Sequence, residues 1–186
     1  MKLISILCLT SVLLFQSSIA TENPDFRGFS QISTLGEKNS KGVDFRFIIP
    51  NQMVKVPFEV DNLVLNYAVP DLNIQVFVHD SETFYSRQES RQHFSKDIYL
   101  RNHCESYKLS KSQKIISFKL TTLASYPAVE CVMESVLDTS VPQLIQSKSW
   151  MILYEDKYIT LQAVVTDKST FQTVEAVLDI MAASSF

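Results

Sequence analysis

The stretch that decides the fold runs from Ser149 to Phe186 and reads SWMILYEDKYITLQAVVTDKSTFQTVEAVLDIMAASSF. It predicts two strands, at 149–155 and 157–166, on either side of a polar turn, and then a helix at 170–184. Apolar and polar residues alternate in the second strand, as they do when one face of a strand is buried. The apolar residues of the helix recur at the spacing of a single stripe, which is typical of a helix that packs on a sheet.

The preceding sequence adds several strands and one further helix. Apolar and alternating runs predict strands at 43–49, 63–69, 72–79, 116–121 and 128–137. A polar run with sparse apolar anchors predicts one surface helix at 81–100, with polar connections at 101–112 and 138–148. This order predicts an α+β fold with a mostly antiparallel sheet covered by helices, in a single domain at 42–186.

The N-terminal residues predict export. Residues 1–20 combine a basic Lys2, an apolar run at 3–15 and small residues before position 21, which is the pattern of a removable signal peptide cleaved after Ala20. A retained anchor is the alternative, but the apolar run is shorter than the roughly 20 residues that span a bilayer. We therefore expect a periplasmic or secreted protein without membrane insertion after signal cleavage. Residues 21–41 are polar and aperiodic, so we expect a flexible leader.

Composition narrows the classes of function. The chain has 17 Lys and Arg against 20 Asp and Glu, a formal net charge of −3. A mildly acidic chain lacks the basic patch that nucleic acid binding requires, so we expect no nucleic acid partner. With 46% hydrophobic residues and only 3 glycines, the chain has the composition of a globular domain with its own core.

Two cysteines follow the signal peptide, Cys104 and Cys131. An even number of cysteines in an exported protein favours pairing, so we expect a disulfide between them. Two buried thiols are the alternative, because Cys131 shares a strand face with the apolar Val129 and Met133.

Two histidines suggest a metal site. His79 and His103, with the adjacent Asp80 and Glu105, would supply imidazole and carboxylate ligands for zinc or copper if the end of one strand meets the later loop. A metal-dependent hydrolase is then the alternative function. No HExxH, Cys-x-x-Cys or EF-hand pattern accompanies these residues, so we expect no metal, no cofactor and no catalytic residue, and solvated loop histidines instead.

A second group of residues suggests a partner surface. Glu130 and Glu134 are predicted on the outward face of one strand, and Tyr158 and Gln162 on the outward face of another. An acidic and aromatic patch of this kind would bind a partner protein or a cation. The competing interpretation is an ordinary solvated sheet face.

Two segments carry a resemblance to a known family. GVDFRFIIP at 42–50, and YITL at 158–161 running on to Phe171 and the final ASSF at 183–186, resemble the PsbP-like family. That family includes photosystem II extrinsic proteins, a yeast Ran-binding protein of the same fold and many bacterial exported proteins. The resemblance implies a sheet covered by helices and a non-enzymatic role in binding or assembly. It carries over no functional residue.

We therefore expect an exported, non-enzymatic binding or accessory protein of PsbP-like fold, whose partner is another protein. The residues themselves support this through the export signal and through the lack of any convergent acid, base and nucleophile. Besides the hydrolase, a secreted effector or toxin-neutralising protein is a further alternative.

Overall fold

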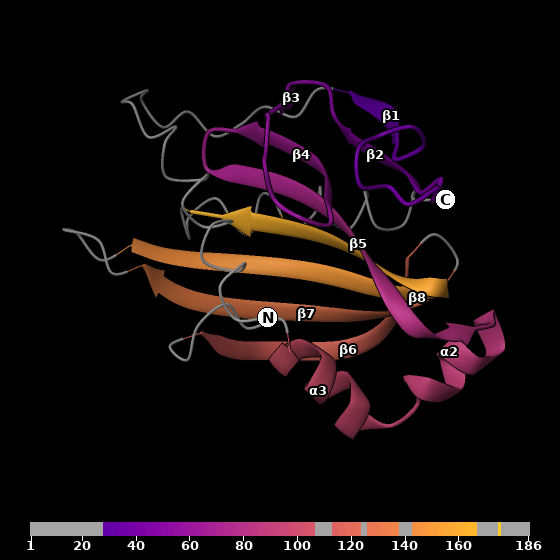
Figure 1. Cartoon of the computed structure of the whole chain (residues 1–186). Helices are drawn as coiled ribbons and strands as arrows, with labels where there is room; N and C mark the ends of the chain where they lie inside the picture. Colours follow the sequence, from indigo (N-terminus) through magenta and orange to yellow (C-terminus); the bar gives the residue numbers. More distant parts are fainter. Residues whose placement is uncertain (1–27, 107–112, 124–125, 138–142, 167–174, 176–186) are drawn as a thin grey trace.

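The computed structural model of this chain describes residues 28–106, 113–123, 126–137, 143–166 and 175. Their main feature is a six-stranded sheet in the order β3-β4-β5-β8-β7-β6, in which every neighbouring pair is antiparallel. A two-stranded sheet, β1-β2, lies near one end of it, and helices α2 and α3 lie near the other (Figure 1). The bounds are β1 Phe29–Ser33, β2 Arg46–Pro50, β3 Val54–Lys55, β4 Leu63–Val69, β5 Leu72–Tyr85, α2 Arg87–His93, α3 Asp97–Ser106, β6 Lys114–Leu123, β7 Tyr126–Leu137 and β8 Gln143–Val165. This architecture confirms the α+β class.

β8 holds the sheet together. It pairs with β7 through residues 143–152 and with β5 through residues 155–165. In Figure 1 its orange and yellow halves run in opposite directions, and the reversal falls at Glu155, whose φ is 53°. The predicted strand, turn and strand are therefore confirmed. The predicted loop at 138–148 is wrong for 143–148, because these residues continue the ladder with β7.

The main sheet has one apolar cluster on each face. The first cluster joins the inward side chains of β5 and β8 to the segment around β2, including Phe45 and Phe47. The second joins α2 and α3 to β7 and β8, with Phe94 fully buried at its centre. Alternation along each strand distributes its residues between the two clusters, so Ile152 belongs to the first and Leu153 to the second.

The segment after β5 differs from the single helix predicted at 81–100. β5 continues to Tyr85, and two short helices follow in place of one. Ser86 begins α2 with a capping box, in which its hydroxyl accepts from the Glu89 N–H and the Glu89 carboxylate accepts from the Ser86 N–H. Phe94 closes α2, and α3 then includes residues 101–106, which were predicted as a loop. The predictions of one helix at 81–100 and of a loop at 101–106 are therefore wrong. The start of α2 has a signal in the sequence, the capping pair Ser86 and Glu89.

The ends of the chain are described only in part. The predicted signal peptide at 1–20 lies outside the described residues. The prediction of a flexible leader at 21–41 is wrong for residues 29–33. These residues form β1, which pairs with β2 from Ser33↔Arg46 to Phe29↔Pro50. Of the predicted helix at 170–184, only Glu175 is described, and it is helical. The expectation that helices cover the sheet rests partly on that segment. Within the described ranges, no helix has both the length and the apolar character needed to cross a membrane.

Candidate functional site

The predicted disulfide is present. Cys104 of α3 is bonded to Cys131 of β7, with the two Cα atoms 5.7 Å apart and both residues buried. The bridge lies within the apolar cluster beneath the helices, so it fastens α3 to the sheet. The prediction of a disulfide is confirmed, and the alternative of two thiols is wrong.

Glu130 is not on an outward face, which corrects the predicted partner surface. Its side chain is only 9% exposed and accepts a hydrogen bond of 3.1 Å from Trp150 Nε1. Lys119 Nζ lies 3.2 Å from one carboxylate oxygen and the buried Lys148 Nζ lies 3.9 Å from the other. Lys148 also lies 3.5 Å from Glu175. Glu130 therefore sits inside an ion-paired cluster, because this face of β7 is covered as well as the face that carries Cys131.

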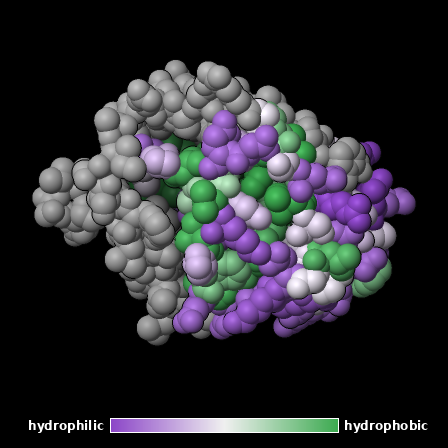
Figure 2. All heavy atoms as spheres, turned by 90° about the horizontal axis from the view of Figure 1, so that it is seen from above, coloured by the Kyte–Doolittle hydropathy of each residue, from purple (hydrophilic) through white to green (hydrophobic). Residues whose placement is uncertain are grey.

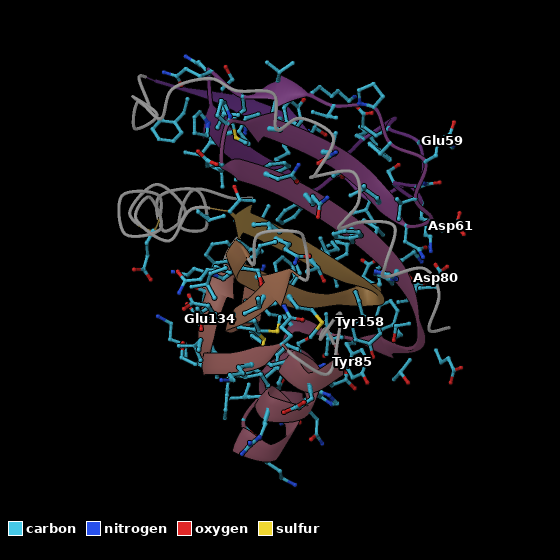
Figure 3. All side chains as sticks on the ribbon, turned by 90° about the vertical axis from the view of Figure 1, so that its left-hand side faces the viewer. Glu59, Asp61, Asp80, Tyr85, Glu134 and Tyr158 are labelled. Carbon is cyan, nitrogen blue, oxygen red and sulfur yellow. A yellow bond between two sulfur atoms is a disulfide. The ribbon has the colours of Figure 1, made fainter. Side chains whose placement is uncertain are left out.

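Tyr158 and Gln162 lie on the opposite face of the sheet from Glu130 and Glu134. Glu130 is in register with Trp150, which belongs to the first apolar cluster, whereas Tyr158 packs against the second. Figure 3 shows Glu134 well away from Tyr158, which lies close to Tyr85. The four residues therefore do not form one patch, since the two pairs lie on different strand faces.

Side-chain amides line the face that carries Gln162. Asn66 of β4 is in register with Gln75 of β5, and Gln75 is in register with Gln162 of β8. This amide row, Asn66, Gln75 and Gln162, thus crosses three adjacent strands. Asn66 and Gln75 are buried, at 1% and 3% exposed, and Gln162 is half-buried.

Two atoms of the amide row, and two further polar atoms on the same face, lack hydrogen bonds. Among the described residues, the buried side-chain atoms without a partner are Asn66 Oδ1, Asn73 Oδ1, Gln75 Nε2 and Ser147 Oγ. Asn73 is two residues from Gln75 on β5, and Ser147 is in register with Met133 of the second cluster, so all four lie on this one face. A buried polar atom without a partner is costly, and such atoms mark positions where a hydrogen-bonding group is expected.

An aromatic rim, made of Phe77, His79 and Tyr158, adjoins the amide row. The rings of Phe77 and His79 are stacked at a centroid distance of 6.2 Å, and His79 is in register with Tyr158. All three side chains are half-buried. Burial, followed by the nearby positive charge of Lys41, lowers the pKa of His79. The imidazole is therefore neutral at pH 7, and the buried row and half-buried rim together make a largely uncharged part of this sheet face, hereafter the amide–aromatic face.

Comparison with known proteins identifies the fold. No protein-family model matches the chain, and no curated protein matches its sequence. The solution structure of cyanobacterial PsbP (CyanoP) from Synechocystis sp. PCC 6803 does match, with a TM-score of 0.53 and 12% identity over 94% of this chain and 98% of that one. The Saccharomyces cerevisiae Ran-binding protein Mog1p has a TM-score of 0.51 and 10% identity, over 86% and 95% of the two chains. The chain has the PsbP-like fold.

A third match agrees with this assignment. LpqN of Mycobacterium tuberculosis, described as involved in cell envelope biogenesis, has a TM-score of 0.50 and 12% identity, over 86% of this chain and 91% of that one. The resemblance predicted from the sequence is therefore confirmed at the level of the PsbP-like fold. At these identities the likeness establishes the fold alone.

Within this PsbP-like fold, the histidines are arranged differently from the predicted metal cluster. His103 of α3 faces His93 of α2, with 3.2 Å between the two Nε2 atoms, whereas His79 stacks on Phe77. The described residues contain no group of three or more His, Cys, Asp or Glu side chains placed to hold a metal ion. The predicted cluster of His79, Asp80, His103 and Glu105 is therefore not formed among the described residues, because β5 and α3 place the two imidazoles in different surroundings.

Exposed apolar side chains on the PsbP-like domain are spread over several elements. Seen from the side of β1 to β4, apolar atoms reach the surface at several places between polar ones (Figure 2). Large exposed apolar side chains occur on β6, as Ile116 and Leu120, and elsewhere as Val54 and Phe84. The amide–aromatic face is distinguished from these by its aligned, uncharged hydrogen-bonding groups. Gln75, Phe77 and His79 share a face because they alternate along β5, and Asn66 joins them through the β4–β5 register.

Proposed function

We propose that this chain is an exported, non-enzymatic accessory protein that binds another protein through the amide–aromatic face. The carrying observation is the amide row that crosses β4, β5 and β8, with the buried atoms without partners beside it. A side-chain amide has a donor and an acceptor, as a peptide group does, so a row of amides complements an extended peptide segment.

The aromatic rim supports the same proposal. Aromatic side chains are enriched in the cores of protein interfaces, and charged residues are depleted there. Phe77, His79 and Tyr158 offer half-buried rings, and Gln162 offers the accessible end of the amide row. A partner segment would lie across the rings and reach the amides beside them.

The fold neighbours are consistent with a binding role. Mog1p is described as a Ran-binding protein, and LpqN as a participant in cell envelope biogenesis. Likeness of fold is weak support for function, so the proposal depends on the surface described above. Export through the signal at 1–20 belongs to the same proposal and agrees with the disulfide, since such bonds persist in oxidising compartments.

The test is capture of partners from the native compartment with matched variants. Gln162→Ala with His79→Ala removes one amide and one ring from the accessible part of the face, and Lys119→Ala on the other face is the control. We expect wild type and the control to recover the same partner, and the double variant to recover at least 10-fold less while melting as wild type does. Equal recovery by the folded double variant, or no partner for wild type, would overturn the proposal.

A further inference from the structure

Two of the three histidines of the chain meet between α2 and α3. His93 Nε2 and His103 Nε2 are 3.2 Å apart, and both side chains are half-buried. Their ring centroids are 5.4 Å apart and the ring planes are tilted by 56°. The two Nε2 atoms therefore face each other between α2 and α3.

This spacing matches that of two histidine ligands on one zinc ion. Zinc binds imidazole nitrogen at about 2.0 to 2.1 Å, and tetrahedral geometry then separates two ligand nitrogens by about 3.3 Å. A hydrogen bond between the two rings would give a similar distance, so the experiment below must separate the two explanations.

The fold holds both imidazoles in place from behind. On α2, Ser90 Oγ donates a hydrogen bond of 3.1 Å to the Leu153 carbonyl of β8, which fastens the helix one turn before His93. On α3, the residue after His103 is Cys104, which is bonded to β7. The Phe94 ring packs edge-on against both imidazoles, at 5.5 Å from His93 and 5.1 Å from His103. Such fixed ligands need little ordering when an ion binds.

We propose that His93 and His103 are a two-histidine binding site for a zinc ion, with water in the remaining coordination positions. No reaction is assigned to it, and it does not involve His79. Because the described residues provide no third protein ligand, we expect zinc to bind more weakly than at the four-ligand sites that hold zinc structurally.

The test is calorimetric titration of zinc chloride into the full, oxidised chain at pH 7, with thermal melts in the same buffer. We expect one zinc ion per chain and a rise in Tm with excess zinc. His93→Gln and His103→Gln should each weaken binding at least 10-fold, because glutamine keeps a hydrogen bond between the two positions but is a poor zinc ligand. His79→Ala is the matched control and should bind as wild type does.

Two results would overturn this site. One is the lack of zinc binding by the folded wild-type chain, which would leave a hydrogen bond as the explanation of the 3.2 Å contact. The other is unchanged binding by both glutamine variants. The proposal is independent of the partner surface, since the zinc site depends on His93 and His103 of α2 and α3, which are not part of the amide–aromatic face.

Discussion

Glu130 is a buried charged residue whose replacement should lower the stability of the fold. Its carboxylate accepts from Trp150 Nε1 and lies near the buried ammonium of Lys148, whose side chain is 2% exposed. Removing one partner of a buried ion pair leaves the other charge without full compensation, which typically costs roughly 3 to 5 kcal/mol. We expect Glu130→Ala to lower the free energy of unfolding by about that amount in urea titrations.

The same cluster provides the control. Lys119 lies 3.2 Å from Glu130, but its side chain is 63% exposed. Exposed ion pairs contribute about 0 to 1 kcal/mol, so Lys119→Ala should change stability little. Similar losses for the two variants would contradict the view that burial, and not the ion pair itself, determines the effect.

His103 should make stability depend on pH. Its folded pKa is lowered to about 4 by burial and by His93, against about 6.5 in an unfolded chain. Between these values the unfolded chain binds more protons, so its protonation destabilises the fold as pH falls from about 6.5 to about 4. We expect His103→Gln to lose less stability than wild type over this range, in denaturation measured without metal. If the stability of wild type and of His103→Gln changed with pH in parallel, His103 would have the same pKa in the folded and unfolded chains, and the prediction would be wrong.

At the scale of elements, the bridge between α3 and β7 is the main fastening of the helical layer. It closes a loop of 27 residues in sequence separation, for which the chain-entropy model gives roughly 3 to 4 kcal/mol. We expect Cys104→Ser with Cys131→Ser to lower the free energy of unfolding by about that much. In hydrogen exchange, α3 should lose protection before the central strands do. A double variant with unchanged exchange in α3 would indicate that packing around Phe94 alone holds the helix.

Elements with strong local signals were predictable from the sequence. β4 and β5 flank Pro70 and Asp71, and the turn between them has Asp71 at a φ of 64°, which is common for Asp in turns. The reversal in β8 was marked by its polar turn in the same way. The predicted single helix at 81–100 is wrong because the capping pair Ser86 and Glu89 starts α2 only at Arg87, after β5 has continued to Tyr85.

The candidate sites depended on contacts that local patterns do not contain. Alternation placed Glu130 opposite Cys131, but it cannot tell whether the second face of a strand is also covered. The amide row forms only when β4, β5 and β8 pair in the observed register, and β8 is far from β4 and β5 in sequence. Likewise, His93 and His103 meet only because the chain turns between α2 and α3.

At the scale of the whole molecule, the order of strands in space differs from their order in time. Among the described strands β8 is synthesised last, yet it lies in the middle of the sheet, where Leu72 pairs with Val165. Until then β5 and β7 have no common neighbour, and such long-range pairing is slow to form. The sheet can therefore be completed only after the residues of β8 have been synthesised.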